Sequence, residues 1–140
     1  MNSDFTLAIH SLTYLALQLD HMSTSDAISE SACVHPVRIR KVLSLLKKHG
    51  FIVSKEGIGG GFIFSKDASE VNLWDIYKIT SDGALQPKCP SSNEDCVVGA
   101  NMQTVLFSIF IGAEKHLGQY LKNYTIKDIV DLVNQKNHIC

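Results

Sequence analysis

Six basic side chains lie close together in the first half of the chain, and their chemistry suits a polyanionic partner. Residues 34–55 contain no acidic residue and six basic ones: Arg38, Arg40, Lys41, Lys47, Lys48 and Lys55. The rest of the chain has 7 basic and 14 acidic residues and therefore a net charge of −7. A positive segment on a negative body orients a protein toward phosphate groups. The segment predicts contact with nucleic acid, although a solvated helix face without a partner gives the same charge pattern.

The chain also has four cysteines, which could bind a metal, form disulfides or act as reactive thiols. Cys33 lies two residues before His35 and close to Arg38, and neighbouring positive charge makes a thiol more reactive toward oxidants. Cys89 and Cys96 are seven residues apart, without the C-x-x-C spacing of redox enzymes. We therefore predict a thiol switch centred on Cys33, which could form a disulfide with Cys89 or Cys96 within one chain or between two. The alternative is that Cys33 is a small buried apolar residue.

Other motifs that carry chemistry do not occur in the sequence. It has no nucleophile elbow and no H-E-x-x-H pair. The glycine-rich stretch Gly57–Gly61 is predicted to connect two strands, whereas a phosphate-binding loop connects a strand to a helix. Four of the histidines, His10, His21, His49 and His138, follow no metal-ligand spacing. We therefore predict that the protein is not an enzyme and that it has no metal site.

The elements that position the basic segment follow from the apolar spacing. Apolar residues at intervals of three and four predict a helix over 5–19, with Asp4 as its N-cap. A short second helix is predicted to begin after Ser23 or Thr24. The third helix is predicted over 36–49, because proline suits a first helical turn and glycine follows at position 50.

A hairpin and further helices are predicted after the basic helix. Strands are predicted over 51–55 and 62–64, joined by the glycine-rich turn. Further helices are predicted over 71–80, from about 96 to 121, and from Thr125 to Val133, with a loop over 81–95. The apolar stripe of the long helix is wide enough to face both its own domain and a partner chain.

The order of helix, helix, basic helix and hairpin is typical of a winged helix-turn-helix domain. The start of the basic helix, with Pro36, Val37 and Arg38, is expected to meet base edges in the major groove, where arginine pairs with guanine. Its later basic residues are expected to contact phosphates. The predicted DNA-contacting residues are Ser23, Thr24, His35, Pro36, Val37, Arg38, Arg40, Lys41, Lys47, Lys55, Gly59 and Gly60.

The segment from Val34 to Phe62 resembles the Rrf2 family of bacterial transcription regulators. The resemblance rests on Pro36, Ile39, Val42, Leu43, Leu46, Gly50–Ser54, Gly57, Gly60–Phe62 and, beyond the hairpin, Leu73–Ile76. It implies a homodimer, joined largely through the long helix, that binds a palindromic operator in double-stranded DNA. The family usually has arginine before the first wing glycine, where this chain has Glu56. We therefore do not extend a minor-groove arginine contact to this chain.

The resemblance also bears on the cysteines. Sensing members of the family ligate an iron–sulfur cluster with three cysteines in the loop before the long helix. Cys89 and Cys96 match that loop, but the region of the third ligand reads Met102-Gln103-Thr104. We therefore expect no cofactor, with a cluster on Cys89 and Cys96 as the alternative; Cys140 or His116 would then have to supply the third ligand.

The expected protein is mainly α-helical with a small β-hairpin. Its expected parts are a winged helix-turn-helix domain over residues 1–80, a cysteine-bearing loop over 81–96, and a dimerisation helix with a C-terminal helix over 97–140. The expected function is that of a homodimeric, sequence-specific DNA-binding regulator, most simply a repressor, under thiol control through Cys33. A protein-binding adaptor built on the same scaffold is the alternative from another class.

The sequence predicts a cytoplasmic protein without membrane contact. The first twenty residues contain Asp4 and Asp20 and no basic leader segment. The longest apolar run, Val105–Ala113, is shorter than the ~20 residues that span a bilayer.

Overall fold

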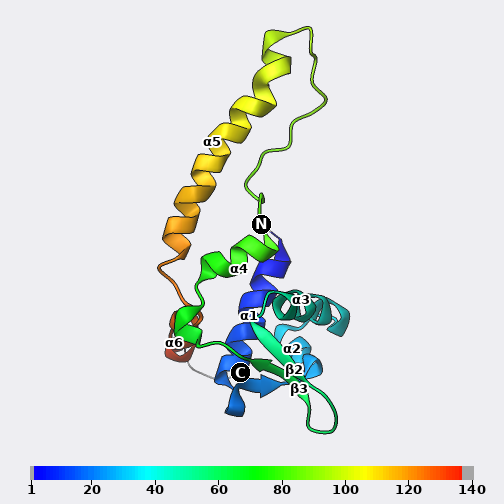
Figure 1. Ribbon diagram of the computed structural model, residues 1–140, viewed down its shortest axis with the longest axis vertical. Helices are drawn as coiled ribbons and strands as arrows, with labels where there is room; N and C mark the ends of the chain where they lie inside the picture. The colour runs from blue at the N-terminus through cyan, green and yellow to red at the C-terminus, as the bar shows by residue number, and fades with distance from the viewer. Residues whose placement is uncertain (1, 137–140) are drawn as a thin grey trace.

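The computed structural model describes residues 2–136, and its first helix, α1 (Ser3–Leu17), lies at the centre of the hydrophobic core (Figure 1). Leu12 and Leu15 on this helix are fully buried. Asn2 caps the helix, since its side-chain oxygen accepts a hydrogen bond from the backbone N–H of Phe5 at 3.4 Å. The prediction that Asp4 is the cap was wrong, because the helix starts at Ser3 and Asp4 lies inside its first turn.

Two short helices after α1 form the helix-turn-helix. A 3-10 turn, η1 (Leu19–His21), ends the first helical segment, and α2 (Ser25–Ala32) follows with Thr24 as its N-cap. The turn after α2 passes through Cys33, which adopts the left-handed conformation with φ +54°. The basic helix α3 (Pro36–Lys48) then starts at the predicted proline. Its buried stripe, as the spacing predicts, is Ile39, Val42, Leu43 and Leu46.

The wing is part of a three-stranded antiparallel sheet. The predicted hairpin is formed by β2 (Ile52–Lys55) and β3 (Gly61–Phe64). A third strand, β1 (Met22–Ser23), pairs with the edge of β3 that faces away from β2, so that β3 is the central strand. The mainly helical winged fold is therefore confirmed, with one strand more than predicted. Residues 22–23 show no strand periodicity because a two-residue strand is defined by its pairing alone.

The second half of the chain leaves the body and returns to it. After η2 (Ala68–Glu70), α4 (Leu73–Thr80) starts two residues later than predicted, because Asn72 and Asp75 form a capping box. The long helix α5 (Val97–Leu121) follows the loop, and α6 (Ile126–Lys136) runs three residues beyond its predicted end. Ile126 in α6 is fully buried in the same core as α1.

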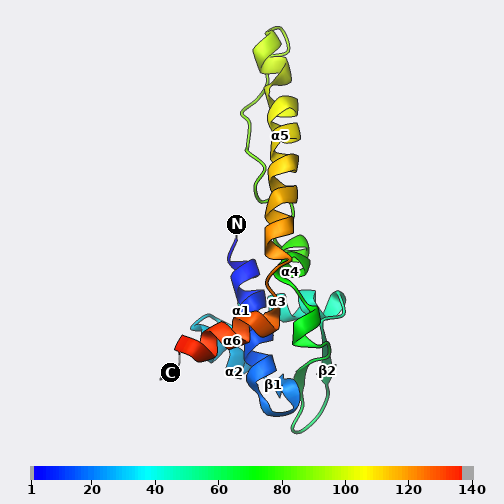
Figure 2. The same ribbon diagram turned by 90° about the vertical axis from the view of Figure 1, so that its left-hand side faces the viewer.

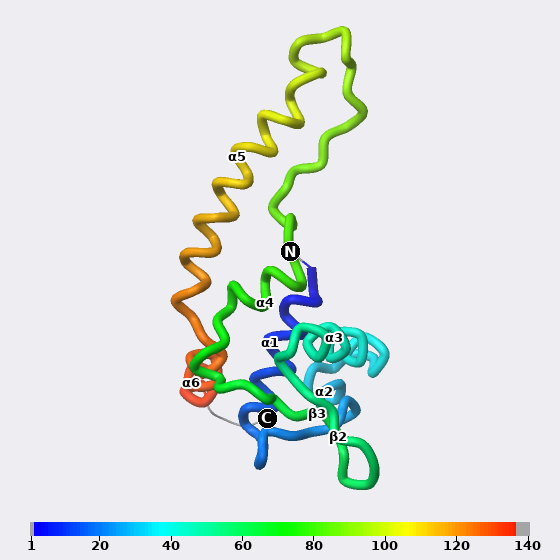
Figure 3. Tube along the Cα trace, viewed as in Figure 1, coloured from blue at the N-terminus to red at the C-terminus, as the bar shows by residue number. Residues whose placement is uncertain are grey.

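Most of α5 projects from the body, as two perpendicular views show (Figures 1 and 2). The loop over 81–96 runs out beside the helix and joins its far end (Figure 3). Among residues 2–136, α5 is the one helix that is long and apolar enough to cross a bilayer, by length and composition alone. The sequence-based estimate used the longest apolar run, Val105–Ala113, which Ser108 interrupts, whereas the mean hydropathy of the whole helix includes the apolar residues on both sides of that run. The projecting helix therefore carries apolar surface that its own chain does not bury.

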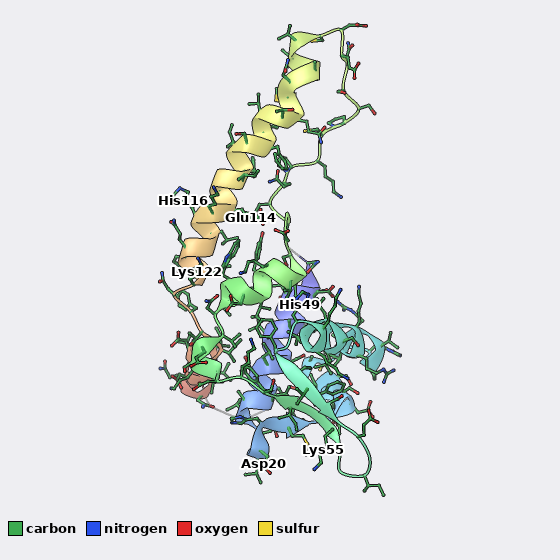
Figure 4. The ribbon with its side chains drawn as sticks, viewed as in Figure 1. Asp20, His49, Lys55, Glu114, His116 and Lys122 are labelled. Atoms are coloured by element: carbon green, nitrogen blue, oxygen red, sulfur yellow. The ribbon has the colours of Figure 1, made fainter. Side chains whose placement is uncertain are left out.

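The base of α5 is fixed to α4 by aromatic packing. The rings of Trp74 and Tyr77 stack with centroids 5.2 Å apart. A Cβ atom at Gly118 of α5 would lie only 2.9 Å from the Trp74 ring, so this position admits no larger residue without displacement. Glu114, which points from α5 toward this side (Figure 4), accepts a hydrogen bond from the backbone N–H of Gly83 at 3.1 Å. The Trp74 ring of α4 and the backbone of Gly83 in the loop thus hold α5 in its direction.

The hydroxyl group of Tyr77 gives a stability prediction. The Tyr77 oxygen is buried without a hydrogen-bond partner among the described residues, and burial together with the nearby Glu114 carboxylate raises the pKa of Tyr77 to about 12. We expect Tyr77→Phe to raise the free energy of unfolding by about 1 kcal/mol at neutral pH, because it removes an unpaired polar group and keeps the ring. Urea unfolding of both proteins measures the difference.

The same group makes alkaline stability depend on pH. The pKa in the folded state lies above the unfolded value of 10.0, so the neutral phenol is favoured by folding. Below pH 10 the phenol is neutral in both states, and its titration does not change the free energy of unfolding. As pH rises from 10 to about 12, the unfolded state loses the proton first, so the free energy of unfolding falls. Tyr77→Phe should show a smaller decline over this range; equal declines in the two proteins would contradict the assignment.

Candidate nucleic-acid interface

The helix α3, which carries the basic residues, is capped at both of its ends. His35 caps the N-terminus, because its Nδ1 accepts a hydrogen bond from the backbone N–H of Val37 at 3.1 Å. The first turn of the helix holds no acidic residue, and Lys47 and Lys48 stand in its last turn, where cations are favourable. The buried stripe directs the basic side chains to the solvent side. The face therefore presents a regular rod with positive charge, which the major groove accommodates.

Two basic residues on one flank of α3 contact the N-terminus of α1. The guanidinium of Arg38 donates a hydrogen bond to Ser3 Oγ. Lys41 Nζ lies 3.8 Å from a carboxylate oxygen of Asp4. Both side chains are thereby drawn toward the protein rather than toward the centre of the exposed face. No sequence signal predicts these pairs, because the partners are separated by more than thirty residues.

Val37, Arg40 and Lys48 are also exposed on α3. Arg40 forms no hydrogen bond or ion pair within residues 2–136. Val37 is 57% exposed, which leaves an apolar patch in the first turn of the helix. On the other flank, Lys47 Nζ donates a hydrogen bond to Ser54 Oγ of β2 at 2.8 Å, which ties the helix to the wing.

The remaining predicted contacts lie at the edges of this face. Ser23 is in β1 beside β3, and Thr24 uses its hydroxyl to cap α2 by accepting from Ala27 N–H at 3.1 Å. Lys55 stands at the start of the loop that joins β2 and β3 (Figure 4). Gly59 and Gly60 form the turn of the wing. The structure thus places the predicted residues on α3, at the start of α2 and on the adjoining wing.

The three cysteines of the described residues lie in two separate places. Cys33 is exposed in the turn between α2 and α3, where its thiol donates weakly to the carbonyl oxygen of Glu30. Cys89 is half-buried in the loop, and Cys96 is the exposed N-cap residue of α5. The backbone N–H groups of Gly99 and then Val98 lower the pKa of the Cys96 thiol, as expected at a helix N-terminus. The alternative that Cys33 is a small buried residue is therefore wrong.

The arrangement within one chain does not fit an iron–sulfur cluster. Such clusters are held by four ligands, usually cysteine thiolates. Among residues 2–136, no three His, Cys, Asp or Glu side chains converge on a common site. His116 is on the side of α5 opposite Glu114 (Figure 4), and Cys140 lies outside the described residues. The donors that the described chain brings together are too few.

Comparison with known proteins places this geometry in a family. The family model Rrf2, described as an iron-dependent transcriptional regulator, matches residues 1–132. The chain is 27% identical over 132 residues to YwnA of Bacillus subtilis, covering 94% of this chain and 97% of YwnA. It is 28% identical over 130 residues to the HTH-type transcriptional regulator NsrR of Shouchella clausii, covering 91% of this chain and 85% of that protein.

Solved structures agree with the fold. A crystal structure from Lactobacillus plantarum superposes with a TM-score of 0.80 at 28% identity, covering 99% of this chain and 93% of the other. The T. potens IscR structure superposes with a TM-score of 0.73 at 16% identity, which supports the fold alone, and covers 100% of this chain and 92% of the other. The basic recognition helix, the glycine-rich wing and the family match over residues 1–132 agree, and the chain belongs to the Rrf2 family of helix-turn-helix transcription regulators.

Proposed function

We propose that this regulator binds a palindromic operator as a homodimer in the cytoplasm and acts as a repressor. The observation that carries the proposal is the exposed face of α3, where Arg40 is unengaged and acidic residues are absent. A repressor is the simplest regulator on this scaffold, because binding at a promoter is enough to block transcription. The geometry also supports different roles for the basic residues, with one contacting bases and the others contacting phosphates.

Arg40 is the side chain that we assign to base reading. It stands in the second turn of α3 with its guanidinium free among the described residues, so it can form the bidentate contact with guanine. Arg38, which the sequence suggested for this role, is held by Ser3 and is better placed for the DNA backbone. Lys41, Lys47 and Lys48 complete the phosphate contacts.

The dimer is assigned to the exposed side of α5. Val98, Met102, Val105 and Ile109 follow one another at intervals of four, three and four, which places them on one stripe of the helix. Each is at least 44% exposed. The stripe would cost free energy in water and is spaced as in a coiled-coil seam, so we propose that a second copy covers it. A palindromic operator then follows from two-fold symmetry.

Salt dependence of duplex binding tests the proposed function. A duplex operator is first obtained by selection from a random pool with the wild-type protein. We expect the logarithm of its affinity to fall linearly with the logarithm of salt concentration, with a slope reduced by about 0.9 for each phosphate contact removed by Lys→Ala. Fluorescence anisotropy of the labelled duplex measures the slope. A protein-only adaptor would bind no duplex at any salt concentration.

We also propose thiol control of operator binding through Cys33. Cys33 is exposed next to the first turn of α3, so a bulky or charged adduct there would disturb the recognition helix. Figure 1 shows the loop that holds Cys89 and Cys96 extending away from α2 and α3. A disulfide with Cys33 would therefore join two chains. Cys96, with its lowered pKa, is the more reactive partner for such a bond.

The Cys33→Ser variant distinguishes thiol control from simple repression. We expect hydrogen peroxide to weaken operator binding by wild type at least tenfold and to leave Cys33→Ser unchanged, with Cys89→Ser as the matched control. Equal responses of wild type and Cys33→Ser would overturn the proposal. An absorption spectrum with iron and sulfide assays, on protein purified without oxygen, tests the cluster alternative: stoichiometric iron and sulfide would assign the signal to a cluster instead.

A further inference from the structure

The tip of the wing presents one side chain, that of Ile58, which is fully exposed. Gly57 and Gly59 on either side have φ values of +90° and +75°, which side chains disfavour. A Cβ atom at Gly60 would clash with the carbonyl oxygen of Lys55, so no side chain fits there. The Gly60 N–H donates to the Gly57 carbonyl oxygen at 3.0 Å and closes the turn. The backbone thus isolates Ile58 at the end of the hairpin.

The base of the wing contributes no net charge. Lys55 and Glu56 are adjacent and both exposed. Their opposite charges therefore largely cancel in the electrostatic potential that a DNA phosphate beside the wing would experience. A neutral wing gains little affinity by displacing counterions from DNA. Its contribution has to come from its backbone and from the apolar side chain of Ile58.

We propose that Ile58 enters the minor groove beside the recognition helix and makes the wing select A·T over G·C pairs there, which rests on the proposed DNA-binding function. The floor of the minor groove differs between these pairs by the 2-amino group of guanine. A branched apolar side chain can lie against an A·T floor. At a G·C pair it would desolvate the amino group without offering an acceptor, which is costly. The minor groove admits apolar side chains of this size, since architectural proteins insert isoleucine from it between base steps.

The sheet holds Ile58 in a defined place relative to α3. The strands of the wing pair from Ile52 with Phe64 to Lys55 with Gly61, so the turn is the end of a continuous ladder. The hydrogen bond from Lys47 to Ser54 joins the ladder to the C-terminal part of α3. When α3 lies in the major groove, the groove next along the duplex is a minor groove, and the wing is the element that extends beside the helix (Figure 1).

Base substitution at the flank of the selected operator tests this contact. We expect wild type to prefer A·T pairs at one flanking position of each half-site, and Ile58→Ser to lose this preference together with about five- to thirtyfold in affinity. A G·C pair at that position should weaken binding of wild type but not of Ile58→Ser. An inosine–cytosine pair, which lacks the 2-amino group, should restore wild-type binding.

Two controls separate this contact from charge effects. Ile58→Val keeps a branched apolar side chain and should retain the A·T preference. Because an apolar contact releases no counterions, Ile58→Ser should keep the wild-type salt slope, whereas Lys48→Ala should reduce it. Failure of wild type to bind any duplex would overturn the proposed function itself. Wild-type affinity and preference in Ile58→Ser, or no rescue by inosine, would overturn only the role of Ile58.

Discussion

Arg40→Ala should weaken binding to the selected operator by about 5- to 150-fold at fixed salt, because one bidentate contact with guanine is worth about 1–3 kcal/mol. Arg40 is exposed on α3, and it forms no hydrogen bond or ion pair among residues 2–136 that would have to break before it reaches a base. The loss should be largest for the selected sequence and small for an unrelated duplex. Fluorescence anisotropy with both duplexes measures the two affinities.

Two further variants identify the kind of contact that Arg40 makes. Arg40→Lys keeps the charge but not the planar fork, so it should retain the salt slope and lose discrimination. Arg38→Ala removes the same charge from a side chain held by Ser3, and it should lower affinity for both duplexes alike. An equal loss on selected and unrelated duplexes in Arg40→Ala would show that Arg40 contacts phosphate instead.

Ile109→Glu should convert the protein to a monomer and reduce operator affinity by more than 100-fold. Ile109 is 59% exposed in the single chain and stands in the α5 stripe that we assign to the dimer. Burial of an unpaired carboxylate in an apolar seam costs several kcal/mol. A monomer also loses the second half-site, which a dimer reaches at high effective concentration. Sedimentation velocity and anisotropy measure the two effects.

A matched variant on the same helix separates the seam from net charge. Gln103 is exposed on α5 but lies outside the stripe of Val98, Met102, Val105 and Ile109. Gln103→Glu adds the same charge and should leave the dimer and its affinity almost unchanged. Dimeric Ile109→Glu would show that another surface joins the subunits. If instead the affinity of Ile109→Glu falls while the dimer persists, α5 affects DNA binding by another route.

Much of the DNA-binding fold could be predicted because its signals are local. The buried stripe of α3 repeats with the helical period, and Pro36 and Gly50 mark its two ends. The hairpin follows from alternation around a glycine-rich turn. The basic face of α3 could be predicted for the same reason, since helical periodicity separates the charged residues from the buried ones.

Features that depend on distant partners could not be predicted. β1 is a strand only because Met22 and Ser23 pair with β3. The hydrogen bond from Arg38 to Ser3 forms only when α1 packs against α3. The sequence therefore does not show that Arg38 has a partner in the fold while Arg40 has none among residues 2–136. Cys33 is exposed and adopts the left-handed conformation after α2, and residue type alone indicates neither.

The return of α6 to the body has a consequence for the order in which the protein is made. The body is closed by hydrogen bonds between distant segments: Leu73 N–H to Tyr124 O and Ile126 N–H to Val71 O, each 2.9 Å long. During synthesis the N-terminal helices and the wing leave the ribosome first, but the position that Ile126 fills stays open until α6 emerges. The core of the DNA-binding domain is thus completed by α6, after the whole of α5 has been translated. A nascent chain that stalls within α5 would present recognition residues on an unfinished core.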